Sequence, residues 1–126
     1  MVGTLAGGFV AVDGVAFDDA THAGPREVRY TGPEQFRAVS GRPYVQGPVT
    51  WECAWEAMTT DAFLALYTIW NLKLNTNTGP RVTLTLSDPR NGGTTQSYDC
   101  WMDEPQFAMV DLYVRKVVAR FVSVIG

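Results

Sequence analysis

The chain has 126 residues, of which 46% are hydrophobic and 18% are charged, and its formal net charge is −3. This length fits one domain, residues 1–126, that buries its own core without help from disulfides or metals. The charge is mild and its carriers are dispersed, with Arg115-Lys116 as the only basic pair, so we expect no specific nucleic-acid partner.

Membrane and export signals are also missing from the sequence. No apolar run reaches the roughly 18 residues that cross a bilayer. Residues 1–8 lack the basic start and the longer apolar core of a signal peptide. We therefore expect synthesis in the cytoplasm and no membrane partner.

The strongest turn signal is Asp13-Gly14, which lies between short apolar runs within residues 9–17. A two-residue Asp-Gly link supplies the positive φ angles of a type I′ turn, so we predict a β-hairpin. Residues 18–26 are rich in turn formers and predict a loop. A short strand follows at 27–30.

An extended arm or loop is predicted at about 31–48. Gly-Pro dipeptides open and close this segment at residues 32–33 and 47–48, and further Gly and Pro residues interrupt it. We expect an irregular path over the surface, with one short strand near 36–40.

Residues 49–57 alternate as a half-buried antiparallel strand does. Trp51, Cys53 and Trp55 fall on one face, and the acidic and hydroxyl side chains fall on the other. We predict that the tryptophan face points into the core.

The period then changes to that of a helix, predicted at about 59–73. Phe63, Leu66, Tyr67 and Trp70 recur at 3.6-residue spacing. One helix in a strand-rich chain predicts a mainly β fold with one α-helix. The expected packing joint between sheet and helix consists of Trp51, Cys53, Trp55, Phe63, Leu66 and Trp70.

Two further strands are predicted at 81–87 and 95–103, joined by the turn-rich residues 88–94. Val82, Leu84 and Leu86 point inward in this prediction. The pair is therefore expected to form a hairpin with one apolar and one polar face.

The last strand is predicted at about 110–124. Leu112 and Val114 share one of its faces, and Val118 continues that face only across the charge of Lys116. A β-bulge or sharp bend at this point reconciles the two halves.

Cys53 and Cys100 both lie on strand faces that are predicted to point inward. We interpret them as buried free thiols that pack as small hydrophobic groups, with a disulfide as the alternative. Neither has the exposed, cationic surroundings of a nucleophilic cysteine.

The sequence offers no constellation for catalysis or for a cofactor. Its one histidine, His22, lies near Asp18 and Asp19 in a polar loop, but further metal ligands at workable spacing are missing. No glycine-rich phosphate loop occurs. We therefore expect no catalytic residue, no cofactor, no metal and no enzyme activity.

One acidic group leaves a hydrolase as an alternative. Asp99, Asp103 and Glu104 gather near the end of one predicted strand, and Asp88 precedes the adjoining turn. Paired carboxylates perform glycoside hydrolysis when they are held a few ångströms apart. Solvated charges at a strand end are the commoner explanation.

Trp101 differs from the other tryptophans. It is out of phase with the inward Cys100 and Met102, so it points to the outer face of the sheet beside Asp99. Another subunit or the segment 32–48 is expected to cover it. A sugar-stacking platform is a third interpretation.

The order of these parts resembles that of small tail proteins of long-tailed bacteriophages, of the tail tube, distal tail and minor tail ring types. The resemblance covers roughly residues 44–122. It rests on the tryptophan-rich strand that leads to a helix, the link Ser-Asp-Pro-Arg-Asn-Gly-Gly at 87–93, and Tyr-Asp-Cys-Trp-Met-Asp-Glu-Pro at 98–105.

The resemblance implies an antiparallel β-sandwich or partly open barrel flanked by the single helix. It also implies a ring, commonly hexameric, in which sheet edges join around a channel for DNA or a tape-measure protein. The chain lacks an obvious long hairpin insertion between its strands, although residues 18–48 are long enough to supply an equivalent arm.

The leading hypothesis is a non-enzymatic structural protein of the virion, a ring-forming component of a phage tail at or near the distal end, in the baseplate or tip. Its partners are then copies of itself and neighbouring tail proteins, and it resides in the tail after synthesis in the host cytoplasm. Alternatives are a β-sandwich module that binds carbohydrate or a receptor, a major tail tube or tail-terminator subunit, and the hydrolase. Candidate subunit-interface residues are Tyr44, Trp101, Arg115, Lys116 and Arg120.

Overall fold

The computed structural model describes residues 2–6, 10–17, 24–76, 79–87 and 94–124. Its elements in chain order are β1 (Val2–Ala6), β2 (Val10–Val12), β3 (Val15–Phe17), β4 (Glu27–Thr31), β5 (Glu34–Arg37), β6 (Pro43–Gln46), β7 (Thr50–Met58), α1 (Thr60–Leu74), β8 (Arg81–Ser87), β9 (Thr95–Met102), β10 (Met109–Val110) and β11 (Val114–Ser123).

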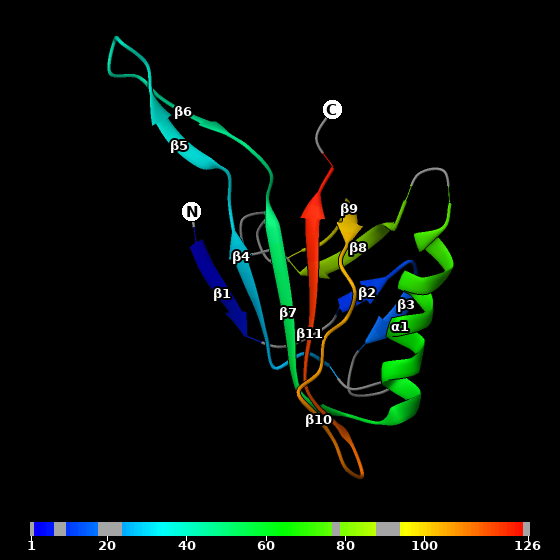
Figure 1. The fold of residues 1–126 in the computed structure, drawn as a ribbon. Helices are drawn as coiled ribbons and strands as arrows, with labels where there is room; N and C mark the ends of the chain where they lie inside the picture. The colour runs from blue at the N-terminus through cyan, green and yellow to red at the C-terminus, as the bar shows by residue number, and fades with distance from the viewer. Residues whose placement is uncertain (1, 7–9, 18–23, 77–78, 88–93, 125–126) are drawn as a thin grey trace.

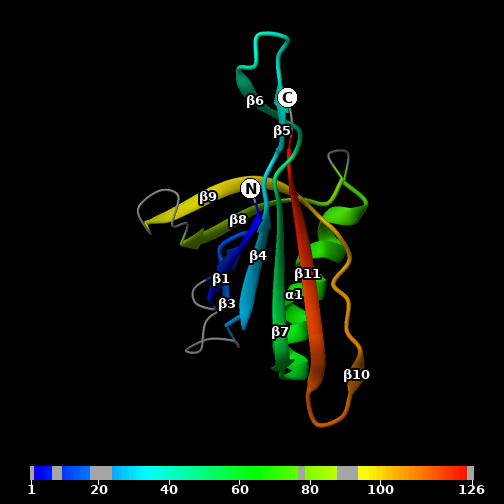
Figure 2. The ribbon, with the colours of Figure 1, turned by 90° about the vertical axis from the view of Figure 1, so that its left-hand side faces the viewer.

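The main sheet is antiparallel, with strand order β1-β4-β7-β11-β9-β8-β2-β3, and β10 pairs beside β11. It is not closed into a barrel, because β1 and β3 remain as its two edges. Strands β8 and β9 run across the upper part of Figure 2, while β4, β7 and β11 run upright. The prediction of a mainly β, antiparallel fold with a single helix is confirmed for the described residues.

The sheet bends so that its two halves face each other over one core. Trp51 on β7 contacts Tyr98 on β9, with ring centroids 4.6 Å apart, although β11 separates these strands in the sheet. The largest fully buried side chains come from both halves and from α1; they are Trp51, Trp55, Phe17, Phe121, Met58, Leu66, Leu84, Leu86, Met102, Val10, Val12 and Val82.

The helix begins and ends close to the predicted residues. Thr59 caps it, because its hydroxyl oxygen accepts a hydrogen bond from the Ala62 amide at 3.1 Å, and Asn75 is the C-terminal cap. Lys73 in the last turn lies 3.6 Å from a carboxylate oxygen of Asp13. This ion pair ties the helix to the β2–β3 turn, beside which α1 runs in Figure 1.

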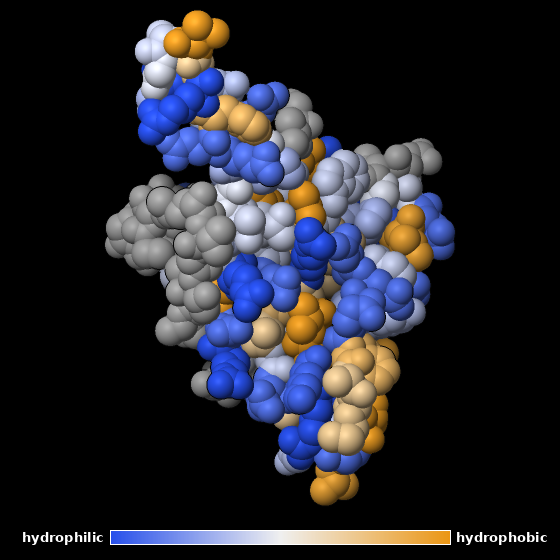
Figure 3. Space-filling model, turned by 60° about the vertical axis from the view of Figure 1, so that its left-hand side comes forward, coloured by the Kyte–Doolittle hydropathy of each residue, from blue (hydrophilic) through white to orange (hydrophobic). Residues whose placement is uncertain are grey.

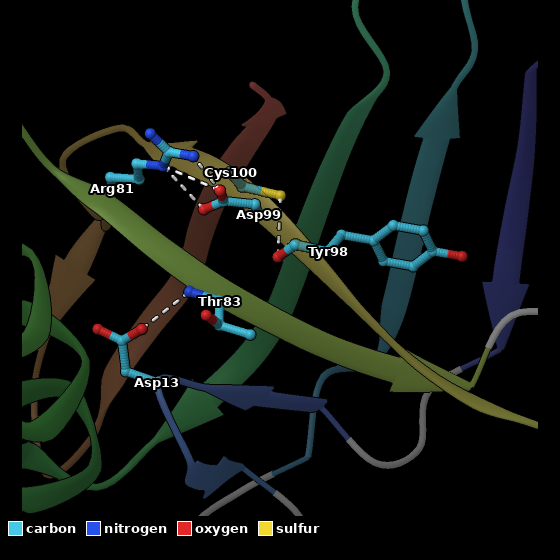
Figure 4. Close-up of polar contacts among 6 residues, drawn as sticks. All are labelled: Asp13, Arg81, Thr83, Tyr98, Asp99 and Cys100. Carbon is cyan, nitrogen blue, oxygen red and sulfur yellow. Dashed lines mark hydrogen bonds and ion pairs between the residues drawn. The ribbon is translucent and has the colours of Figure 1, made fainter. Parts of the chain in front are cut away.

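The predicted Asp-Gly hairpin is confirmed. Asp13 and Gly14 have φ angles of 51° and 81°, as a type I′ turn requires. The Asp13 carboxylate also accepts a hydrogen bond from the Thr83 amide at 2.8 Å, which fixes the turn against β8 (Figure 4). The turn therefore positions both β2 and the end of α1.

An extended segment projects within the predicted range 31–48, but its path is regular. Residues 34–46 form a two-stranded hairpin, β5–β6, which pairs only with itself, so the prediction of an irregular path with one strand near 36–40 is wrong. The glycine and proline residues that suggested irregular chain lie at its tip and its base, where turns are needed. We call residues 34–46 the arm; it projects from one end of the molecule (Figure 1).

The last strand is shorter than predicted, and its inward phase differs. Lys116 has a φ of 55°, and the pairing with β7 is interrupted at this residue and resumes at Val117 in the same register. The chain is therefore irregular where a bulge or bend was predicted, but without the extra residue of a β-bulge. The alternation of buried side chains changes phase here, and Val117 and Phe121 are buried while Leu112 is exposed. The prediction that Leu112 and Val118 share the core-facing side was therefore wrong.

Candidate functional site

The outer face of β8 and β9 carries a polar and aromatic group, Arg81, Asp99 and Trp101, which we call the outer cluster. The Arg81 Nε donates to both carboxylate oxygens of Asp99, at 3.0 and 2.9 Å, and a second guanidinium nitrogen also donates to the carboxylate (Figure 4). The guanidinium carbon lies 6.0 Å from the centroid of the Trp101 ring. The three side chains therefore form one rigid platform on the sheet.

The electrostatic interactions in the outer cluster favour the charged forms of Arg81 and Asp99. The hydrogen bonds from Arg81, followed by its charge, hold the pKa of Asp99 below its ordinary value. A general acid in glycoside hydrolysis needs a raised pKa instead. Asp103 lies 4.0 Å from Arg120, so Asp99 and Asp103 have separate cationic partners.

Trp101 lies on the outer face, as its phase predicted, and is 37% exposed. Gly79 approaches it so closely that a Cβ there would lie 3.4 Å from the indole ring. The arm does not fold back over it, because the arm extends away from the body (Figures 1 and 2). The prediction that the segment 32–48 covers Trp101 is therefore wrong, and cover by another subunit stays a prediction.

The cysteines are buried and unbonded to each other. Burial raises the pKa of Cys53 to about 12, with smaller contributions from Cys100 and Glu52. Burial likewise raises the pKa of Cys100 to about 12, and its thiol donates to the Tyr98 carbonyl at 3.7 Å (Figure 4). The interpretation as buried free thiols is confirmed.

Among the described residues, no three His, Cys, Asp or Glu side chains lie close enough together to hold a metal ion. His22, Asp18, Asp19 and Asp88 lie outside those residues. Within the described part of the chain, no helix is long and apolar enough to cross a membrane.

The expected packing joint is assembled in the structure. Trp51, Cys53, Trp55 and Leu66 are buried, and Phe63 and Trp70 are partly buried against the same core. The four buried side chains are closed to an external ligand, so the joint serves the fold.

The predicted subunit-interface residues do not form one patch. Tyr44 lies on the arm, where its ring stacks on Phe36 at 5.7 Å. Arg115 and Lys116 lie near the opposite end, where the Arg115 Nε donates to Asp111 at 2.7 Å. Arg120 and Trp101 lie between these ends, on the outer face of the sheet.

A second exposed surface was missed in the sequence, at the end of the molecule opposite the arm. The chain turns there through β10 into β11, and most side chains of the turn are exposed. Figure 3 shows hydrophobic atoms gathered at this lower end and again at the tip of the arm. We call the lower set the apolar tip; its residues are Phe107, Met109, Val110, Leu112 and Tyr113.

A third surface lies on the outer side of α1. An open groove of about 540 Å³ runs between the helix and β3, and its lining is mostly apolar. The sequence carried a signal for it, since α1 has only two charged residues, Asp61 and Lys73. We call it the α1 groove; its lining residues are Val15, Asp61, Leu64, Ala65, Thr68, Ile69 and Leu72.

Fold and surfaces together define a class: a mainly β, antiparallel protein with one covering helix, a projecting arm and several exposed apolar surfaces. Comparisons with known proteins add no family to this description. No protein-family model matches the chain, and no curated protein or solved structure matches it either.

Proposed function

We propose that this protein is a non-enzymatic structural component of a virion, a ring-forming subunit of a phage tail at or near its distal end. The observation that carries the proposal is the gathering of exposed apolar side chains on two projections, the arm and the apolar tip, at opposite ends of the molecule. Contiguous exposed apolar surface on a folded protein marks interaction sites.

The arm itself supports assembly. Every residue of β5 and β6 is exposed, and the two strands pair only with each other. An isolated two-stranded hairpin is only marginally stable in water. Such an arm gains order and buries its side chains when another chain covers it.

The edges of the main sheet support the same proposal. Its order begins at β1 and ends at β3, so the sheet has two open edges. Strand edges are templates for pairing with another chain, and closed symmetric assembly removes that exposure. The same features would suit a major tail tube subunit or a tail-terminator subunit, which also form rings but at other positions in the tail.

Negative-stain electron microscopy of the purified protein tests the proposal. We expect rings of uniform diameter, and we expect the protein to co-purify with neighbouring tail proteins when they are expressed together. Dispersed single particles at the highest attainable concentration, without such co-purification, would contradict it.

The outer cluster supports a second candidate, a module that binds carbohydrate. An exposed indole beside a fixed ion pair offers a stacking face and polar groups together. Tyr44, the second aromatic residue of this hypothesis, lies on the arm and stacks on Phe36 instead. Glycan-array binding that is abolished by Trp101→Ala, in a protein that still folds, would favour this candidate over the ring.

A further inference from the structure

Helix α1 is apolar on two sides, although only one of them faces the core. Ala62 and Leu66 are buried on the inner side. On the outer side Leu64 is 59% and Leu72 is 71% exposed. Ala65 and Ile69 line the same groove, so an apolar strip stays exposed on this side beside the polar Thr68. Contiguous exposed apolar surface of this kind marks an interaction site.

The α1 groove has a particular charge pattern as well as an apolar lining. Asp61 is its only charged lining residue, and within the described part of the chain Asp61 forms no ion pair. A ligand that fits this groove is apolar along its length and carries a cation at one end.

The arm has the complementary chemistry. Its exposed apolar side chains are Phe36, Val39, Tyr44 and Val45. Arg42 lies beside them at the turn, and no described carboxylate pairs with its guanidinium. The arm also points away from α1, so the arm and the groove of one copy lie on different sides of the molecule (Figure 1).

Phe36 and Tyr44 pair across the hairpin, so their rings lie on one face of the arm. We propose that the arm of one copy lies in the α1 groove of the next copy, with Phe36 and Tyr44 against Leu64 and Leu72 and with Arg42 directed to Asp61. This contact joins two different surfaces, so it is heterologous, and its repetition closes a ring when the rotation between copies permits. The inference rests on the proposed function and names the contact that builds the ring.

Two surface variants test the contact. Tyr44→Asp alters the arm, and Leu72→Glu alters the groove; the two side chains are 47% and 71% exposed, so the fold is expected to survive both changes. Each variant alone is expected to weaken self-association at least about tenfold, because a charge replaces an apolar group that the contact buries.

Mixing the two variants provides the decisive comparison. The Tyr44→Asp chain retains an intact groove and the Leu72→Glu chain retains an intact arm, so an equimolar mixture has one functional contact. Native mass spectrometry is expected to show a heterodimer and no larger species. The Tyr44→Asp/Leu72→Glu double variant is the matched control, and it is expected to remain monomeric.

The possible results separate this inference from the proposed function. Wild-type rings that persist in both single variants would overturn the arm-in-groove contact and leave the ring standing. Loss of assembly in both variants without a heterodimer on mixing would also overturn the contact. A wild-type protein that stays monomeric would overturn both.

An exchange of charges covers the case in which a single variant fails to fold, as judged by circular dichroism. Arg42→Asp and Asp61→Arg are each expected to weaken assembly, and the two together are expected to restore it. Assembly that is equally weak in the combined variant would contradict the pairing of these two residues.

Discussion

The ring of Phe17 on β3 meets the indole of Trp55 on β7 edge-on, with centroids 6.0 Å apart and planes at 65°. These strands are not neighbours, since β3 ends the sheet order and β7 lies in its other half. The contact therefore joins the two halves of the bent sheet across the core. It places Trp55 at the centre of the fold, away from the exposed surfaces.

Replacing Trp55 with Ala is expected to lower the free energy of unfolding by about 3–5 kcal/mol, because it empties a large space in a closely packed core. Urea unfolding followed by fluorescence measures the loss. Trp101→Ala is the control, and a smaller loss is expected because that side chain is partly exposed. Soluble Trp55→Ala protein of wild-type stability that fails only in assembly would contradict the core assignment.

The irregular backbone at Lys116 gives a prediction about conformation. Its φ of 55° is in the left-handed region, which β-branched residues strongly disfavour. Lys116→Val is expected to lower the unfolding free energy by about 1 kcal/mol or more. Lys116→Gly removes the same charge but suits the backbone, so it is expected to be neutral or slightly stabilising. Equal effects of the two changes in thermal unfolding would contradict the role of this φ angle.

The Arg81–Asp99 ion pair gives a prediction about acid. The folded-state pKa of Asp99 is lowered, so the unfolded state binds the proton more tightly. The contribution of the pair to stability is therefore present above the ordinary pKa of 3.8 and is lost as the pH falls through the lower, folded-state value. Asp99→Asn is expected to reduce the fall of the melting temperature in acid, and Arg81→Gln is expected to do the same. Wild-type acid dependence in both variants would contradict the prediction.

The buried thiols give a prediction about reactivity. A thiol with a pKa of about 12 is protonated at neutral pH, and the core also shields it. We expect Cys53 and Cys100 to resist a thiol-specific chromogenic reagent in the folded protein and to react after unfolding. Rapid reaction of either thiol in the native state would indicate an accessible cysteine and contradict the structure.

The same two pKa values imply a loss of stability in alkali. A raised folded-state pKa means that the folded protein keeps protons that the unfolded chain releases. Their contribution is complete below the ordinary pKa of 9.0 and is lost as the pH rises toward about 12. Cys53→Ala is expected to show a smaller fall in melting temperature over this range than the wild type.

Local patterns in the sequence predicted the elements that depend on local physics. The Asp13-Gly14 turn was readable because few residue pairs supply two positive φ angles. The helix was readable from the 3.6-residue spacing of its apolar side chains, and its observed limits lie close to the predicted 59–73. The conflict of phase around Lys116 also predicted an irregularity there, although the structure shows no extra residue.

The predictions that were wrong concern features that depend on contacts between residues far apart in the sequence. The residues around Lys116 were assigned to the wrong face because the residue at which the alternation is interrupted decides the phase of those on either side. The arm was predicted to be irregular because its sequence contains glycine and proline residues, which are also common in loops. The pairing of Phe36 with Tyr44 that makes it a hairpin leaves no local signal. The α1 groove required the position of β3 beside the helix, which no local pattern supplies.

The central claim is that exposed surfaces of this protein bind further copies of it. Sedimentation velocity of the wild-type protein over a wide range of concentrations tests this most directly. We expect one discrete assembly of several subunits, and we expect its fraction to rise and the monomer fraction to fall as the concentration increases. A single monomer boundary at every concentration would contradict it.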